Sequence, residues 1–303
     1  MPNALSMTPG AASKRRAAML FIVCCAVIIS FDGPMIRSMD AALPWQVNFY
    51  RSIALLGFVG IAIVLRFGRA SLAAISGIGV RGCIAGALFG FSTMAFVQSM
   101  VLTTVANTLF ILGTIPFLTA LMARLLLKEK LGTATVLTMA VAAAGLTVMV
   151  LENLAVGGGA GSALALVSAA CFALYAVLLR GSRHKEMLPV LLISALVIIV
   201  VAALVKAGDL RISTHDLILC LIWGGLLTGT AHWLFILSSR HLAAAEVTLF
   251  LLLELALGPI LVWLMIGEQP SGWTLAGGVL IVSAVAGRAA LELAGGVNRR
   301  PRP

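Results

Sequence analysis

One acidic residue stands in the middle of a long apolar run. Glu254 lies within residues 243–266, five positions before Pro259, whose ring nitrogen leaves the Leu255 carbonyl without its helical donor. An Asp or Arg at the centre of a membrane-spanning helix costs roughly 2.5–3.5 kcal/mol on insertion scales, so ionisable groups persist there where they are paired or line a wet cavity. We therefore expect Glu254 to bind a cationic group of a ligand. A neutral carboxyl bonded to a neighbouring helix is the alternative.

An imidazole and an indole lie together in the run 216–238. His232 and Trp233 follow Gly225 and Gly229, which form a G-x-x-x-G pair typical of close helix packing. The spacings place both rings on one helical stripe with the glycines, so both are expected to face protein rather than lipid. A ring there would stack on an apolar or aromatic side chain of a substrate. A core histidine satisfied by a neighbour is the alternative for His232.

An acid and a base lie at matching depth in the first two apolar runs. Asp32 and Arg51 occupy the outer thirds of 17–37 and 45–65, so an ion pair between neighbouring helices is expected. The alternative is an external gate in which Arg51 binds a substrate carboxylate. Trp223 is expected to anchor a helix end at the membrane interface. Weaker cavity candidates are Gln98, Ser92, Thr93 and Tyr175.

The composition requires these residues to be positioned by membrane-spanning helices. Of 303 residues, 61% are hydrophobic and only 11% charged, and the mean hydropathy is +1.10. That leaves too little polar surface for a soluble enzyme, a secreted disulfide scaffold or a disordered regulator. The five cysteines all lie in apolar runs without a C-x-x-C pair, so we expect no disulfide, no metal and no cofactor.

Ten runs are long enough to cross a bilayer, so the expected fold is an all-α polytopic membrane protein. They lie near 17–37, 45–65, 80–101, 105–127, 132–151, 161–180, 188–206, 216–238, 243–266 and 271–293. With a cytoplasmic N-terminus, seventeen Lys and Arg residues fall on the cytoplasmic side and four on the other. Both termini are therefore predicted to be cytoplasmic. The basic clusters look like helix-end anchors, which argues against nucleic-acid binding.

The two halves of the chain match at a shift of 139 residues. Five spans per half would insert the second copy from the opposite side, which is typical of secondary transporters with a shared midplane site. The expected division is a tail 1–16, a repeat 17–151, a Gly-rich linker 152–160, a repeat 161–293 and a tail 294–303. The matched pairs include Gly86 with Gly225, Gly90 with Gly229, Glu129 with Glu268, and Asn107 with Glu246.

The last of these matches predicts a second pair of polar candidates. Asn107 and Glu246 are expected at opposite mouths of one cavity, although helix-end capping or interfacial solvation equally explains Glu246. The mirrored glycines Gly86 and Gly90 are interpreted chiefly as packing residues. Together these matches predict that the third, fourth, eighth and ninth spans surround the path.

The motifs of both halves resemble the EamA repeats of the drug/metabolite transporter superfamily. They are Pro116-Phe117-Leu118 with Glu129, Gly258-Pro259 with Gly267-Glu268, and Asn48-Phe49-Tyr50-Arg51. The resemblance covers roughly 17–293 and implies a ten-helix carrier that exports small metabolites, with bacterial amino-acid exporters closest in size and layout. The small multidrug branch carries a carboxylate in the first helix, whereas Val23-Cys24-Cys25-Ala26 has none, which argues against proton-coupled export of cationic drugs.

We therefore expect a secondary transporter that exports amino acids, aromatic or otherwise neutral, by alternating access, with hinges at Pro116 and Pro259. An exporter of nucleosides, purines or drug-like compounds is the alternative, and a membrane-embedded enzyme or a channel a distant one. No G-x-x-x-x-G-K-[ST] sequence occurs, which argues against ATP-driven pumping. Proton coupling through Glu254 or His232 and facilitated diffusion both remain open. The expected partners are a small-molecule substrate and lipid, and the expected state is a monomer.

Overall fold

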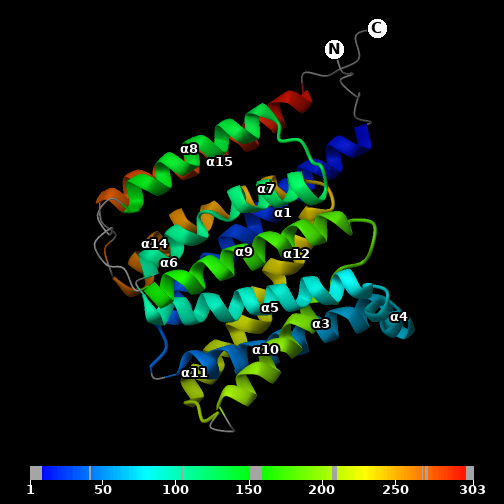
Figure 1. Cartoon of the computed structure of the whole chain (residues 1–303), viewed down its shortest axis with the longest axis vertical. Coiled ribbons are helices and arrows are strands. Elements are labelled where there is room, and N and C mark those ends of the chain that lie inside the picture. The colour runs from blue at the N-terminus through cyan, green and yellow to red at the C-terminus, as the bar shows by residue number, and fades with distance from the viewer. Residues whose placement is uncertain are drawn as a thin grey trace.

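The computed structural model describes residues 9–40, 42–103, 105–150, 159–206, 210–267, 269 and 272–297. Over those residues the chain is helical, with short connections and no strand (Figure 1). Glu268, the expected repeat mate of Glu129, lies outside the described residues, as do both chain ends and most of the linker 152–160. The second half begins with a helix at Gly159.

The helices follow the apolar runs along the chain. The first half contains α1 (Pro9–Ile29), α2 (Asp32–Arg37), α3 (Pro44–Phe67), η1 (Gly68–Ala70), α4 (Ser71–Ser76), α5 (Gly79–Leu102), α6 (Val105–Leu112), α7 (Ile115–Leu126) and α8 (Thr133–Val150). The second half contains α9 (Gly159–Gly181), α10 (Val190–Lys206), α11 (Thr214–Leu221), η2 (Ile222–Thr228), α12 (Gly229–Ser239), α13 (Ala244–Phe250), α14 (Leu252–Ile266) and α15 (Gly272–Val297).

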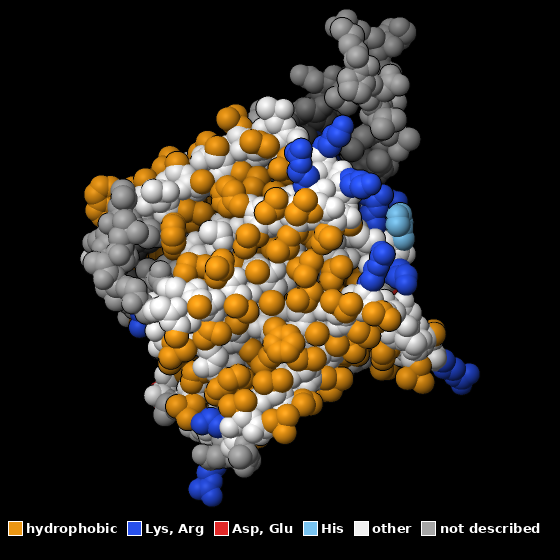
Figure 2. Space-filling model, in the orientation of Figure 1, with side chains coloured by type: hydrophobic (Ala, Val, Ile, Leu, Met, Phe, Trp, Pro, Cys, Tyr) orange, Lys and Arg blue, Asp and Glu red, His pale blue; other side chains and the backbone are white. Residues whose placement is uncertain are grey.

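Among the residues that the structure describes, seven helical segments are long and apolar enough to cross a membrane. They are Ser13–Arg37, Pro44–Ser76, Gly79–Leu102, Thr108–Leu126, Gly159–Gly181, Thr214–Ser239 and Ala244–Ile266. Three shorter apolar helices, Thr133–Val148, Val190–Lys206 and Leu275–Ala290, fall on the remaining expected spans. Large apolar side chains such as Leu65 stay exposed and cover the outer face (Figure 2), as expected where lipid is the solvent. The chain is therefore a polytopic membrane protein.

The helices pack mainly between the two halves of the chain. In Figure 1, α8 lies beside α15 at one edge, whereas α3, α10 and α11 lie at the other. Between these edges, α5 packs on α9, and α1 packs on α12. The largest apolar core cluster is built at these contacts and contains Ile22, Phe89, Tyr175 and Phe235.

Two spans are interrupted in the middle. The fourth expected span breaks at Gly113–Thr114, between α6 and α7, because Pro116 cannot donate to the carbonyl of Leu112. The ninth breaks at Leu251, between α13 and α14. Pro259, where we expected the hinge of that span, instead lies inside α14.

A hydroxyl accounts for the second break better than the proline does. The Thr248 Oγ1 donates to the carbonyls of Ala244 and Ala245, each 3.2 Å away. Such back-bonding to the preceding turn bends helices. The half-helix α14 therefore starts close to Glu254, which belongs to its first turn.

Glycines allow the close contacts that the G-x-x-x-G pairs predict. A Cβ on Gly86 would lie 2.6 Å from the Ile193 Cβ and 2.7 Å from the Val190 carbonyl oxygen, so α5 and α10 meet almost backbone to backbone. Gly90 follows one turn later against the Ser194 carbonyl, 3.2 Å from where its Cβ would stand.

The mirrored glycines pack against α3. Gly229 lies against the ring of Phe58, and a Cβ on Gly225 would be 3.4 Å from the Ala54 carbonyl oxygen. All four glycines of the two G-x-x-x-G pairs therefore lie at helix contacts.

Ion pairs join the two halves at the end of the bundle where the visible Lys and Arg side chains gather (Figure 2). Each acid there bonds a base of the other half. The pairs are Glu129 with Arg180 at 2.8 Å, Glu246 with Arg15 at 2.9 Å and Glu186 with Arg66 at 3.1 Å. Several of these side chains are partly exposed, so each pair by itself contributes little, but together they tie the halves at this end.

The glycine contact makes a direct prediction for stability. Gly86→Ala should lower the melting temperature of the purified protein, because overpacking a tight contact typically costs about 1–3 kcal/mol. Gly57 in α3 is the matched control, since nothing lies within 4 Å of its Cβ position. Gly57→Ala should leave the melting temperature unchanged or raise it, because alanine favours a helix. Equal melting curves for the two variants, followed by circular dichroism, would contradict the packing role.

Candidate functional site

A cavity of about 110 Å³ lies in the middle of the bundle, between the two halves. It is bounded by α1, α2, α3, α5, α9 and α12 and by both interrupted spans. It therefore includes the third, fourth, eighth and ninth spans that we expected around the path, and adds the first, second and sixth. Its polar lining residues are Asp32, Arg51, Ser92, Thr93, Ser168, His232, Thr248 and Glu254, and its aromatic ones are Phe89, Phe96, Phe172 and Phe235.

Both helix breaks open onto this cavity. Leu112, Ile115 and Pro116 line it from the first break, and Leu251 and Leu252 from the second. The ends of broken helices carry backbone groups without intrahelical partners and oriented peptide dipoles. In membrane carriers such ends are typical binding elements for polar substrates and ions.

Glu254 is placed by the second break. It lines the cavity from the first turn of α14, and its backbone N–H donates to the Leu251 carbonyl at 3.0 Å. A carboxylate in the first turn of a helix is stabilised by the helix dipole. The expected site residue therefore faces the cavity, but it stands after a helix break and not in the middle of an unbroken helix.

Asp32 and Arg51 both line the cavity but do not contact each other directly. Within the described residues, neither a hydrogen bond nor an ion pair joins their side chains. Trp223 lies between them instead. Its Nε1 donates to Asp32 Oδ1 at 2.7 Å, and the Arg51 Cζ stands 4.3 Å from the centroid of its ring. The expected direct pair is thus replaced by an acid–indole–base arrangement.

Trp223 is not the interfacial anchor that its position predicted. Its side chain is 0% exposed and packs with Val47 and Cys220. It belongs to η2, a π-helical turn inserted between α11 and α12. A π-turn shifts the register of a helix locally, and such turns occur frequently at functional sites.

Gly224 explains how α3 comes so close to this turn. The position of its Cβ coincides with the Arg51 carbonyl group, so any side chain there would collide with the backbone of α3. The π-turn and the glycine together bring the Trp223 ring over the Arg51 guanidinium.

The charges around the cavity do not balance among the residues the structure describes. Two carboxyl groups, Asp32 and Glu254, face one guanidinium, Arg51. The guanidinium keeps an unused donor, because Arg51 Nη1 is buried and has no hydrogen-bond partner among the described residues. Buried unpaired donors are rare in folded proteins, and the guanidinium that carries this one also lines the cavity.

Aromatic rings form one wall of the cavity. The ring of His232 lies 4.3 Å from that of Phe89, and Phe172 lies 5.4 Å from Phe235, centroid to centroid. The Nδ1 of His232 is 3.1 Å from the Thr228 carbonyl, so Nδ1 carries the proton and donates to it. This wall suits an apolar or aromatic group of a ligand.

Three predicted site residues lie away from the cavity lining. Tyr175 is fully buried behind the wall, where its ring stacks on Phe89 at 4.8 Å. The Tyr175 hydroxyl, the Gln98 Nε2 and the Trp233 Nε1 are buried without partners in the described part of the chain. The structure therefore places Tyr175 behind the aromatic wall, whereas Gln98 and Trp233 are half-buried and absent from the cavity lining.

Glu246 lies in a cluster of ion pairs. Glu246 accepts from Arg15 and, at 2.7 Å, from Arg288, and it also accepts from the backbone N–H of Ala243. Glu246 thus caps α13 at the charged end of the bundle, which agrees with the alternative prediction of helix-end capping. The side chain of Asn107 lies outside the described residues.

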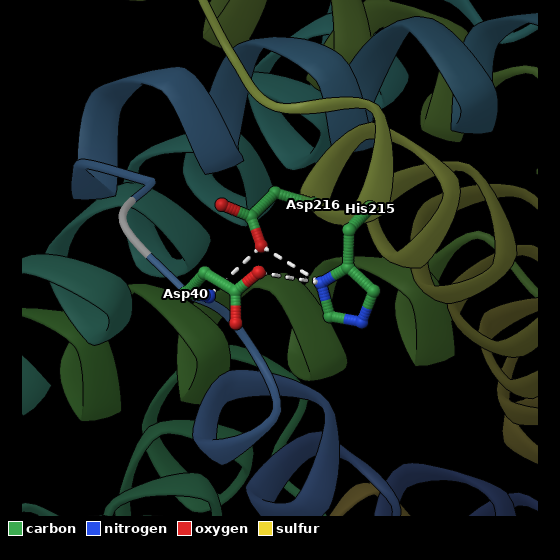
Figure 3. A group of neighbouring side chains, drawn as sticks. All are labelled: Asp40, His215 and Asp216. Carbon is green, nitrogen blue, oxygen red and sulfur yellow. Dashed lines mark hydrogen bonds and ion pairs between the residues drawn. The ribbon is translucent and has the colours of Figure 1, made fainter.

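A separate acid–histidine cluster lies away from the cavity, where the α2–α3 connection meets α11 (Figure 3). His215 Nδ1 is 3.3 Å from Asp40 Oδ2 and 3.4 Å from Asp216 Oδ1. Asp216 is buried and also accepts from the Asp40 backbone N–H at 2.9 Å. These contacts account for the cluster as a tie between the two halves.

Comparison with known proteins agrees with this architecture. Residues 159–287 match the EamA-like transporter family. A solved crystal structure covers 95% of this chain and is itself covered completely, with a TM-score of 0.75 and 21% sequence identity, so the likeness shows the fold alone. No curated protein sequence matches the chain.

The family match falls on the half that contributes Ser168, Phe172, His232 and Glu254 to the cavity. It confirms the resemblance that the motifs of the second half carry. The chain therefore has an EamA-like transporter family domain at residues 159–287, consistent with the drug/metabolite transporter superfamily.

Proposed function

We propose that this protein exports neutral amino acids, with a preference for apolar or aromatic side chains, by alternating access. One observation carries the proposal. A single cavity combines a guanidinium, a carboxyl group on a half-helix and an aromatic wall. These are the three groups that recognise the carboxylate, the ammonium and the side chain of an amino acid.

The proposed recognition assigns one role to each group. Arg51 binds the substrate carboxylate, since a guanidinium matches a carboxylate with two parallel hydrogen bonds. Glu254 binds the ammonium, and Phe89 with Phe172 packs on the side chain. The cavity volume of about 110 Å³ is small beside the 300–1,000 Å³ of typical drug-sized pockets, which favours a small metabolite.

Charge balance supports a proton as the coupled ion. With Asp32 and Glu254 ionised and Arg51 charged, the cavity has a net charge of −1, which a zwitterion does not change. An unpaired charge in a low-dielectric site is strongly unfavourable. We therefore propose that one proton resides on the carboxyl pair in part of the transport cycle.

Two inverted halves would supply the alternation. The break at Gly113–Thr114 and the break at Leu251 stand 137–138 residues apart, close to the shift of 139 that aligns the two halves in sequence. The helix contacts have the same symmetry. The third span packs on the sixth, as α5 on α9, and the corresponding eighth span packs on the first, as α12 on α1. Both observations support a pseudo-two-fold relation between 17–151 and 161–293, which carriers use to open to each side in turn.

The charged end is proposed to face the cytoplasm of a bacterial inner membrane. The three interhalf ion pairs and most of the cations lie there, as the positive-inside rule requires. In the state described here these pairs hold that end together, and opening toward the cytoplasm would have to break them.

An exporter of nucleosides or purines is the second candidate. The aromatic wall of Phe89, Phe172 and His232 favours it, because a base stacks on such rings as well as an aromatic side chain does. A nucleobase gives the Arg51 guanidinium no carboxylate to bind. Binding of adenosine in preference to phenylalanine would therefore decide for this candidate.

Removing the Glu254 charge should weaken amino-acid binding. Truncating one partner of a buried charge pair costs about 2 kcal/mol or more, which is roughly 30-fold in affinity. Glu254→Gln should lose this much for L-phenylalanine in a calorimetric titration of the protein in nanodiscs. It should not weaken 3-phenylpropionate, which lacks the ammonium. Asp40→Asn, which removes a carboxyl that is 70% exposed and lies outside the cavity, is the control expected to bind normally. Unchanged phenylalanine affinity in Glu254→Gln would refute the assignment.

A pH gradient should change the rate of transport. We expect net phenylalanine uptake into proteoliposomes to respond to an imposed pH gradient while the membrane potential is clamped, because a carboxyl of the cavity takes up and releases a proton. Glu254→Gln should remove that response. A wild-type rate that ignores the gradient would show facilitated diffusion instead.

The orientation is testable with single cysteines. An impermeant maleimide added to intact cells should label Arg211→Cys but not Arg183→Cys, and both should react after the cells are opened. Both positions are exposed, and the five native cysteines lie within helices. Labelling of Arg183→Cys in intact cells would reverse the orientation.

A further inference from the structure

We propose that Trp223 is a positioning residue that keeps Asp32 and Arg51 from pairing with each other, so that Arg51 stays open for the carboxylate of the substrate. The proposal rests on the proposed function for the identity of that substrate. Trp223 itself is not among the lining residues of the cavity and is 0% exposed, so it acts through its two neighbours.

The edge of the indole binds one charged side chain and its face binds the other. The ring N–H donates in the plane of the ring to Asp32 Oδ1 at 2.7 Å. The ring face receives the Arg51 guanidinium, with Cζ 4.3 Å from the centroid. A charge-assisted hydrogen bond and a cation–π contact in a desolvated site are each favourable. Trp223 therefore satisfies an acid and a base at once without neutralising either.

Without the indole, the two charges have each other as their nearest available partners. Both side chains line one cavity of about 110 Å³, and oppositely charged groups in a low-dielectric interior attract strongly. A bidentate Arg–carboxylate pair would occupy the donors that a substrate needs. The cation–π contact leaves these donors unused, as the unpartnered Arg51 Nη1 shows.

The backbone holds the indole at this place. The π-turn η2 carries Trp223, and Gly224 lies directly against the Arg51 carbonyl. The next residue of the turn, Gly225, continues the contact along α3 at Ala54. The π-turn and its glycines therefore hold the indole at the place where it separates Asp32 from Arg51.

The experiment compares two probes that differ in one group. L-Phenylalanine has a carboxylate and phenethylamine does not, so the ratio of their affinities reports whether Arg51 is open. Trp223→Phe keeps a ring face but loses the N–H donor, which frees Asp32 to pair with Arg51. It should weaken phenylalanine by about tenfold or more while changing phenethylamine by less than about threefold, since only the carboxylate contact is lost. Arg51→Gln gives the ratio expected when the guanidinium is absent.

A second substitution distinguishes a positioning role of Trp223 from a role in folding. Adding Asp32→Asn to Trp223→Phe removes the competing carboxylate and should restore the preference for phenylalanine. Trp263→Phe, which removes an indole that is 41% exposed on α14, should leave the ratio unchanged. Equal loss of both probes without rescue by Asp32→Asn would show a merely structural role, and a full preference for phenylalanine in Trp223→Phe would also overturn the proposal.

A second readout does not need the substrate. Phenylglyoxal modifies arginines that it can reach and that are not bound in ion pairs, and peptide mass spectrometry locates the modified residue. Arg51 is 6% exposed, so the reagent has to reach it through the cavity that it lines. Arg51 should react in the wild type, be protected in Trp223→Phe and react again in the variant that also has Asp32→Asn. Failure of wild-type phenylalanine binding with this pattern intact would overturn the proposed function alone. Equal reactivity of Arg51 in all three proteins would overturn the role of Trp223.

Discussion

The central constraint on this molecule is that charges inside a bilayer must find partners without water. Asp32, Arg51 and Glu254 surround one cavity, and each is held by a different device: an indole N–H, an indole face and the first turn of a half-helix. None of these three contacts neutralises the charge that it holds, whereas a site built only for stability would avoid unneutralised charges. The arrangement is therefore better explained by a ligand that completes it.

Local irregularities in the helices create this arrangement. The breaks at Gly113–Thr114 and Leu251 bring backbone ends to the cavity, and the π-turn η2 turns Trp223 inward. Regular helices would leave all backbone groups satisfied and all side chains at fixed angular steps. In this bundle regular helices supply most of the side chains that line the cavity, whereas the irregular segments bring backbone ends and Trp223 to them.

The ends of the bundle differ from its centre. Partly exposed ion pairs and the Asp40–His215–Asp216 cluster tie the halves near the water-facing ends, whereas glycine contacts and aromatic stacking hold the middle. Exposed ion pairs are weak singly and can exchange with water, but packed glycine contacts cannot. This difference is compatible with a bundle that opens at its ends around a persistent central packing.

The sequence by itself determined the helical membrane architecture, because apolar runs of membrane length have no other stable state in lipid. It also singled out Glu254, His232, Asp32 and Arg51, since charged or polar groups are conspicuous in such runs. Only the tertiary structure decided that Trp223 donates a hydrogen bond to Asp32, which lies 191 positions away in the sequence. It also decided that Glu246 belongs to an ion-pair cluster, and that one helix breaks at Leu251 and not at Pro259. Periodicity places a residue on a helix face, but which partner that face meets depends on how helices distant in the chain pack together.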